Sequence, residues 1–369
     1  MRQHTPLLPD VLTGSFTRRV TVNVFHGRDR VETGLAFESW SFDGDLGARL
    51  TTSGVGTVVY PSVNGESMSP VGTKGVLSPF RARVELVMEI LAGSFRESVS
   101  LGMFRVTRIL EARDHTTVVG GVERVVASRV RFEFVTLEAD VERRGFRFPE
   151  VPSSTDSAFE EIRRVTGMPV RETVDDAAIT GDPVWEAKQG GRLDAVRQLG
   201  GILGGTAVVD SLGSWVVIPD QLGDPVGELT LGERGTVLDV GAEIDTDTVY
   251  NVVVGLFEDE NRTPFYSVAE VPNGDLAPGS NYLENTRYYS SEFVKTQAQG
   301  DSAVASVLAL SIGSQQYDVT IQCHINPLVE LGDVLALSGW SRPIVGQLVK
   351  FGMSESPLMN VTLRVAREL

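Results

Sequence analysis

The sequence predicts a mainly β protein with an α+β insert in its middle. Apolar and polar residues alternate with period two over roughly the first 140 residues, and this alternation returns after Pro225. After Pro149, between these two regions, the apolar period becomes helical. Alternation is typical of antiparallel sheets and barrels, in which one face of each strand is buried. We therefore predict three domains, at residues 1–150, 151–225 and 226–369.

Two strands are clear in the first domain. Residues 18–27 (RRVTVNVFHG) place a valine at every second position, and residues 83–91 (RVELVMEIL) alternate apolar residues with Glu85 and Glu89. Residues 51–79 are rich in Gly, Ser and Pro, which predicts loops joining short strands. Residues 129–146 then form a strand that runs into a polar segment.

The second domain is expected to contain two helices and a hairpin. Ser157 and Glu160 have the spacing of a capping box, and apolar residues then recur at helical spacing until Gly167. A second helical stripe lies in residues 193–203, and a hairpin at residues 206–220 follows it, with Gly213 in its turn. The run GGILGG lacks the spacing and the lysine of a phosphate-binding loop, so we expect it only to end the helix.

The third domain is expected to be β again, with one helix. Two strands, at residues 249–257 and 263–271, enclose a polar hairpin tip, and a helix at residues 297–312 places Ala303, Val307 and Leu310 on one face. The last strands are predicted at residues 317–325, 334–340, 344–351 and 360–365. In the first of these strands Val319, Ile321, Cys323 and Ile325 share the apolar face, opposite Thr320, Gln322 and His324.

The charge balance excludes several functions. The chain has 33 basic and 49 acidic residues, a net charge of −16, and no basic stripe interleaved with aromatic residues, so we do not expect it to bind DNA specifically. The segment Gln221–Gly300 has 14 acidic and four basic residues, net −10, and its loops should face solvent or a conduit. We find no signal peptide and no apolar run long enough to span a membrane, and expect a protein made in the cytoplasm.

No set of residues points to catalysis, a cofactor or a metal. The four histidines, His4, His26, His115 and His324, are scattered, and the single Cys323 should be buried on a strand face opposite its neighbour His324. The acidic runs at residues 243–247 and 258–261 lack the spacing of a calcium loop. A carboxylate pair for glycoside hydrolysis stays open, although aromatic residues that would stack on sugars make up only 7% of the chain.

Two stretches resemble the tail hub proteins of long-tailed bacteriophages. The first, residues 192–220, is a helix, a glycine stop and a hairpin. The second runs from the helix with spaced alanines at residues 297–313 to residues 317–337. There Pro327 and the Leu331-Gly332-Asp333 turn match a short sequence pattern common in hub proteins. Residues 101–109 (LGMFRVTRI) are similar to a strand of the first hub barrel.

The resemblance implies two related β-barrels with a small α/β insert, and three chains forming a ring of 3 × 2 = 6 similar units that docks on a sixfold tail tube. It implies a location at the virion tail tip and partners that include further copies of the chain, distal tail and tail tube proteins, the tape measure protein and a spike or fibre protein. Genomic DNA would pass in transit. It names no interface residues. Many hubs continue into wall-degrading regions, which we do not expect in a chain ending at Leu369.

We therefore predict a structural virion protein rather than an enzyme, with no cofactor. Two alternatives remain. A distal tail protein is also a β-rich ring component but forms a hexamer. A carbohydrate-binding or glycan-cleaving adhesin belongs to a different class and would reveal itself by binding glycans or releasing sugar.

Overall fold

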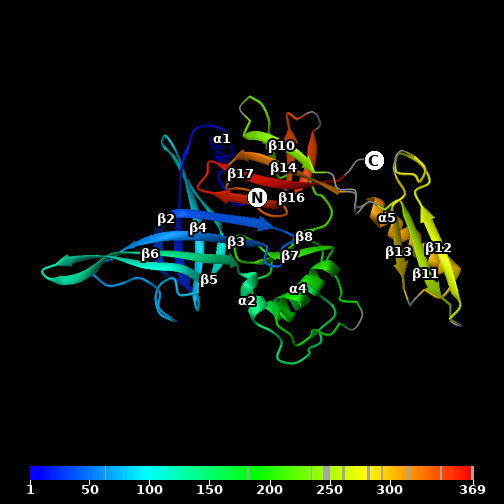
Figure 1. Cartoon of the computed structure of the whole chain (residues 1–369), viewed down its shortest axis with the longest axis horizontal. Coiled ribbons are helices and arrows are strands. Elements are labelled where there is room, and N and C mark those ends of the chain that lie inside the picture. The colour runs from blue at the N-terminus through cyan, green and yellow to red at the C-terminus, as the bar shows by residue number, and fades with distance from the viewer. Residues whose placement is uncertain are drawn as a thin grey trace. The chain divides into compact units, whose positions relative to one another are not determined.

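The computed structural model describes residues 1–62, 64–180, 183–233, 235–243, 250–259, 262–280, 283–291, 294–313, 316–340 and 343–366. Contacts divide the chain into two compact units. The first unit is Met1–Val240 with Thr320–Leu363, and the second is Gly241–Val319 with Arg364–Leu369. The fold is mainly β, as predicted, with a few helices (Figure 1). The division into three domains at residues 150 and 225 stays a prediction.

Six strands close into a barrel in the first unit, after the short helix α1 (Leu8–Leu12). They pair in the order β1-β4-β5-β6-β3-β2, and β2 pairs back to β1. The valines of β1 and the apolar residues of β4 point to the buried side, as the alternation predicts. The bounds are β1 (Thr17–His26), β2 (Asp29–Asp45), β3 (Thr52–Pro61), β4 (Ala82–Ala92), β5 (Phe95–Val119) and β6 (Val122–Thr136).

Strand β3 corrects the sequence reading of residues 51–79, because its ten residues are continuous strand rather than loop. Its glycines are compatible with a strand because aromatic rings from neighbouring strands fill the space above them. The Phe134 ring lies where a Cβ on Gly54 would project, and the Phe37 ring does the same at Gly56. Glycine therefore marks close approach of rings here rather than a turn.

A second ring of six strands is ordered β9-β15-β16-β17-β14-β10. An isolated bridge between Leu231 and Val237 brings the end of β9 beside the start of β10. In β14 the predicted apolar face is confirmed: Cys323 is buried, which raises the pKa of its thiol to about 12, and His324 is exposed. The bounds are β9 (Gly227–Thr230), β10 (Val237–Glu243), β14 (Gln316–His324), β15 (Val334–Ser338), β16 (Ile344–Ser354) and β17 (Leu358–Ala366).

The α/β segment has its own hydrophobic core, built from three helices and a hairpin. The predicted helix cap is confirmed for Ser157, because its hydroxyl accepts a hydrogen bond from the backbone N–H of Glu160 at 3.0 Å. Gly167 ends the helix with φ 63°. The hairpin turn contains Gly213 at φ 78°. The bounds are α2 (Glu138–Arg143), α3 (Ala158–Thr166), α4 (Gly191–Ile202), β7 (Gly205–Val209) and β8 (Trp215–Pro219).

Glu161 is a buried carboxylate inside this segment. Arg164 donates two hydrogen bonds to it, at 2.7 and 2.8 Å, and the indole N–H of Trp185 donates a third at 2.7 Å. Burial alone would raise the pKa of Glu161, but the hydrogen bonds from Arg164 and Trp185 outweigh it and lower the pKa. The carboxylate therefore ties α3 to the loop before α4.

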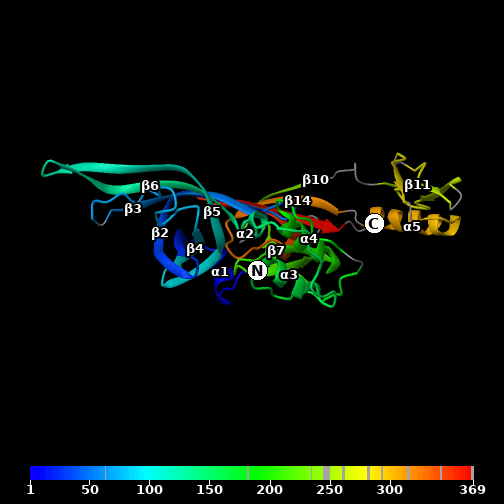
Figure 2. The ribbon, with the colours of Figure 1, turned by 90° about the horizontal axis from the view of Figure 1, so that it is seen from below.

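The second unit is a three-stranded sheet with one helix. The central strand β11 pairs antiparallel with β12 and parallel with β13. The sequence predicts no strand at the position of β13. Helix α5 packs on one face of this sheet (Figure 2), and its bounds match the prediction. The elements are β11 (Val252–Glu258), β12 (Pro264–Glu270), β13 (Thr286–Ser290) and α5 (Gln297–Gly313).

The buried face of α5 is wider than predicted. Ala303 and Val307 pack against the sheet as expected, but the most buried side chains are Val304 and Leu308, one position further along the chain. The side chain of Leu310 lies outside the described residues. Among the described residues no helix is long and apolar enough to cross a membrane.

We expect Glu161→Gln to reduce stability at neutral pH and to have little effect in acid. A carboxylate with a lowered pKa contributes stability above its unfolded value of about 4.5, and this contribution disappears as the pH falls through the folded-state pKa. Chemical unfolding of both proteins between pH 7 and pH 3 measures the difference.

The control is Phe159→Leu, a change in the same buried core that carries no charge. Its loss of stability should be the same across this pH range. An equally constant loss for Glu161→Gln would contradict the prediction.

Candidate functional site: the junction of the two barrels and the α/β segment

The two barrels of the first unit are joined by strand pairing. β2 and β16 run antiparallel, with pairs from Asp45↔Lys350 to Ser41↔Ser354, so one twelve-stranded sheet includes both barrels. The Lys350 ammonium lies 3.2 Å from a carboxylate oxygen of Asp45 across this joint. A joint made of backbone hydrogen bonds is stiffer than a flexible linker, because every pair fixes the register.

Aromatic side chains connect the cores on the two sides of this joint. Phe42 of β2 is fully buried, and its ring contacts two others edge to face. The centroid distance is 6.0 Å to Phe104 of the first barrel and 5.3 Å to Phe351 of β16. The Phe351 ring occupies the position that a Cβ on Gly44 would take. The strands can therefore approach at this register only because residue 44 is glycine.

Glu138 is the buried carboxylate at which the first barrel and the α/β segment meet. Its oxygens accept the backbone N–H of Thr51 at 3.0 Å, the Thr51 hydroxyl at 2.8 Å and the backbone N–H of Val209 at 3.2 Å. The guanidinium of Arg197, from α4, lies 3.3 Å from a carboxylate oxygen of Glu138. Burial raises the pKa of Glu138, and Arg197 and the three other donors oppose that shift.

Arg2 connects the start of the chain to the second barrel. Its side chain is buried and donates to the carbonyls of Pro327, at 2.9 Å, and Val329, while its backbone N–H donates to Leu328 at 2.8 Å. Its Nε has no partner among the described residues. Burial lowers the pKa of Arg2, and the nearby carboxylates of Glu330 and Asp333 oppose this.

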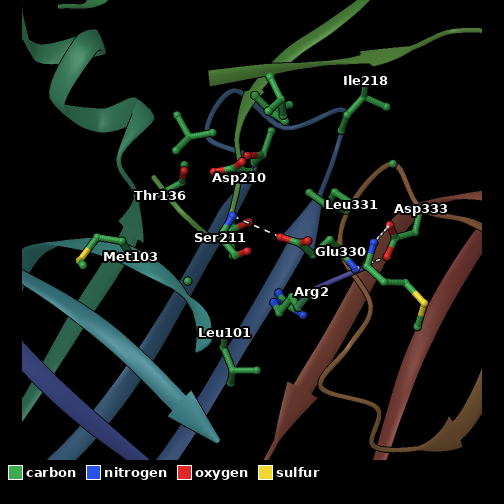
Figure 3. Close-up of a pocket in the computed structure, with 18 of the residues that line it drawn as sticks. Arg2, Leu101, Met103, Thr136, Asp210, Ser211, Ile218, Glu330, Leu331 and Asp333 are labelled. Atoms are coloured by element: carbon green, nitrogen blue, oxygen red, sulfur yellow. Dashed lines mark hydrogen bonds and ion pairs between the residues drawn. The ribbon is translucent and has the colours of Figure 1, made fainter. Parts of the chain in front are cut away.

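A cavity of about 270 Å³ lies where these parts meet (Figure 3). The first barrel contributes Leu101 and Thr136, and the α/β hairpin contributes Asp210 and Ser211. Glu330, from the turn before β15, accepts the backbone N–H of Ser211 at 3.2 Å and so spans the cavity between the hairpin and the second barrel.

The charged side chains of this cavity contact other protein groups. Among the described residues, its lining includes no histidine and no cysteine, the side chains that most often serve as general base or as activated nucleophile. Within the described part of the chain, no group of three or more His, Cys, Asp and Glu residues could hold a metal ion. The charged residues of the cavity instead hold backbone groups or each other, as Arg171 does with Asp210 at 3.0 Å.

The motifs singled out in the sequence lie at different places in the fold. The Leu331-Gly332-Asp333 turn lies in the junction: Gly332 has φ 87°, and a Cβ there would meet Ile218 of β8. The GGILGG run ends α4 as predicted, with Gly204 at φ 75°. The acidic runs at residues 243–247 and 258–261 lie mostly outside the described residues.

Sequence reasoning missed Arg2, Glu138 and Arg197. Glu138 stands in the polar stretch LEADVER, which is typical of a solvated helix end. Nothing in the spacing of that stretch indicates that its first carboxylate is buried. The donors that surround it come from residues 51, 197 and 209, which are distant in sequence.

No protein-family model matches the chain, and no curated protein sequence matches it. Solved structures do. The tail protein from Neisseria meningitidis MC58 superposes with a TM-score of 0.58 at 13% identity, over 95% of this chain and 97% of that one. The 43 kDa tail protein of prophage MuSo2 from Shewanella oneidensis gives 0.58 at 11% identity, over 94% and 96%.

This chain has the fold of these two tail proteins. A chain of the PdpA–VgrG complex also superposes, with a TM-score of 0.53 at 10% identity, over 95% of this chain and 65% of that one. The likeness to the tail proteins extends over almost their whole length, so both barrels and the α/β segment are included.

We expect Glu138→Ala to lower the free energy of unfolding of the first unit by about 2–4 kcal/mol, because two buried N–H groups would lose their acceptor at about 1–3 kcal/mol each. These are the N–H groups of Thr51 and Val209, whereas Arg197, which is 25% exposed, keeps the carbonyl of Ala207. Chemical denaturation followed by tryptophan fluorescence measures the change.

The matched control is Glu142→Ala on the same helix. Glu142 pairs with Arg49, whose side chain is 52% exposed, and such a surface pair contributes below about 1 kcal/mol. Equal losses in the two variants would show that Glu138 has no special role in holding the segments together.

Proposed function

We propose that this chain is a structural hub of a phage-type tail tip. The observation that carries the proposal is the end-to-end match with two tail proteins, which spans more than nine-tenths of each chain. A protein that shares only one domain with a tail component would match only in part. The stiff joint between the barrels also suits a part whose task is to hold a fixed shape.

Three copies of the hub form a closed ring. Each chain supplies two six-stranded rings, so a trimer presents 3 × 2 = 6 similar units. This number matches the sixfold tail tube implied by the resemblance to hub proteins. The strand pairing between β2 and β16 sets the spacing between neighbouring units within one chain.

The partners follow from this position. The ring meets the tail tube or distal tail proteins on one side and a spike or fibre protein on the other, and the tape measure protein and then the genomic DNA pass through it. The chain is made in the host cytoplasm and is incorporated in the virion at the tail tip. Its charge of −16 would keep passing DNA from binding to the wall.

The hub is not an enzyme in this proposal. The polar groups of the junction cavity are engaged in holding the barrels and the hairpin, and the Thr51 hydroxyl in its lining donates to Glu138, which several other donors already hold. Incubation of the purified protein with peptidoglycan should release no soluble fragments. Release of fragments would overturn this part of the proposal.

We expect the full chain to form trimers, measured by mass photometry across a concentration series and by single-particle imaging. Rings with three copies and six similar lobes support the hub. A hexamer would instead indicate a distal tail protein. A chain that remains monomeric and binds a glycan array would indicate an adhesin and overturn the proposal.

A further inference from the structure

An arm with an apolar tip extends from the first barrel. Strands β5 and β6 continue as a two-stranded ribbon beyond Asp114 and Ser128 (Figures 1 and 2). The ribbon carries four valines that are 52–70% exposed. Its turn consists of Gly120 and Gly121, both with positive φ, which fits the tight hairpin turn that matches strand twist. The exposed valines are Val118, Val119, Val122 and Val126.

One long edge of this arm is open. The pairing of β4 with β5 ends at Arg105, so among the described residues β5 from Val106 to Val119 pairs only with β6. On the other side, the loop after β3 bonds to Val125 and Val126 of β6. A stiff ribbon with an open edge and an apolar tip is a docking element rather than a solvated loop.

The second unit has an exposed apolar sheet face. Helix α5 covers one face of β11, β12 and β13, and the other face presents side chains that are 41–70% exposed. The pairing Leu256↔Tyr266 and the neighbouring pairings of Val254 with Val268 and Tyr288 put them side by side. We call Leu256, Tyr266, Val268 and Tyr288 the open face.

The open face has a hollow and an acidic border. A depression of about 490 Å³, whose lining includes Leu256, Tyr266, Glu258 and the basic Lys295, lies at one end. Exposed carboxylates stand at both ends, Glu258 on β11 and Glu270 on β12. A partner that fits here has a narrow apolar tip and positive charge beside it.

The arm has both properties. Arg124 of the arm, and Arg108 and Arg131 on the strands that lead into it, are exposed and form no ion pair among the described residues, and Glu123 is the acidic residue of the arm. The segment Gln221–Gly300, which contains the open face, carries net −10. The arm and the open face therefore both expose apolar side chains, with arginines on the strands that lead into the arm and an acidic segment around the open face, and both belong to the same chain.

We propose that the arm of one copy docks on the open face of a neighbouring copy, with Val119 and Val122 at the hollow. The inference rests on the proposed ring and names the contact that closes it. Two different surfaces of one chain that bind each other form a heterologous interface, and such interfaces close into rings when the rotation permits. Every copy would then contribute one arm and one open face.

The first test is cross-linking between copies. Val119→Cys, with heavy-isotope labelling, is mixed with unlabelled Val268→Cys and treated with a short bis-maleimide. The native Cys323 is buried and stays unreactive. We expect a peptide that links heavy and light chains. The matched control replaces Val119→Cys with Val71→Cys, a 75% exposed valine outside the arm, which should give no such link.

The second test measures assembly. A double variant, Val119→Asp with Val122→Asp, should raise the concentration needed for half-assembly at least about tenfold, since it puts charge at the centre of an apolar contact. Val71→Asp should leave assembly unchanged. Circular dichroism and the unfolding midpoint show whether the variant is folded.

The outcomes separate the inference from the proposed function. If the wild type forms rings that the double variant also forms at the same concentration, the docking is wrong while the hub stands. Cross-links found only within single copies also overturn the docking. The same holds if the arm is needed for binding another tail protein but not for assembly. A wild-type chain that never assembles overturns both.

Discussion

The burial of one carboxylate, Glu138, is the constraint on which the architecture of the first unit depends. An anion removed from water is stable only when donors replace its hydration. Its donors come from Thr51 just before β3, from β7 and from α4, so the α/β segment can take only the position in which all of them reach it. Removing the carboxylate would leave the N–H groups of Thr51 and Val209 without their acceptor, which is why the position is more demanding than its place in a polar helix end indicates.

The joint between the barrels adds a second constraint of a different kind. The pairing of β2 with β16 fixes their register through backbone bonds, and Phe42 fills the space between the two cores. Thr51, which bonds to Glu138, and Phe42 and Phe351 of the joint all line the cavity, and Arg2 and Glu330 connect it to the second barrel and the hairpin. The proposed ring of six similar units from three chains would need this stiffness, because errors in angle between the barrels accumulate around a ring.

The sequence predicts those elements whose cause is local. Alternation locates β1 and β4, and the Ser157 cap and Gly167 stop locate α3, because side chain and neighbouring backbone decide these features together. The sequence does not predict the elements that depend on contacts between residues far apart in the chain. β3 contains glycines that only the rings of Phe37 and Phe134 make compatible with a strand, and β13 pairs with β11 across a long loop. Glu138 looks solvated until residues distant in sequence surround it, and the face of α5 is decided by the sheet beneath it.

The distribution of charge along the arm supports a specific contact over nonspecific adhesion. Exposed strand edges invite pairing with any extended chain, and natural proteins suppress this with charged side chains. The strands that lead into the arm carry such charges, at Arg108, Glu111, Arg113 and Asp114, and the arm itself carries Glu123 and Arg124, while the turn from residue 119 to residue 122 carries none. A sequence under pressure only for solubility would have charges at the most exposed point. Their absence there, next to charges on the strands, indicates that the strands are protected from random pairing and that the turn is kept apolar for a partner that buries it.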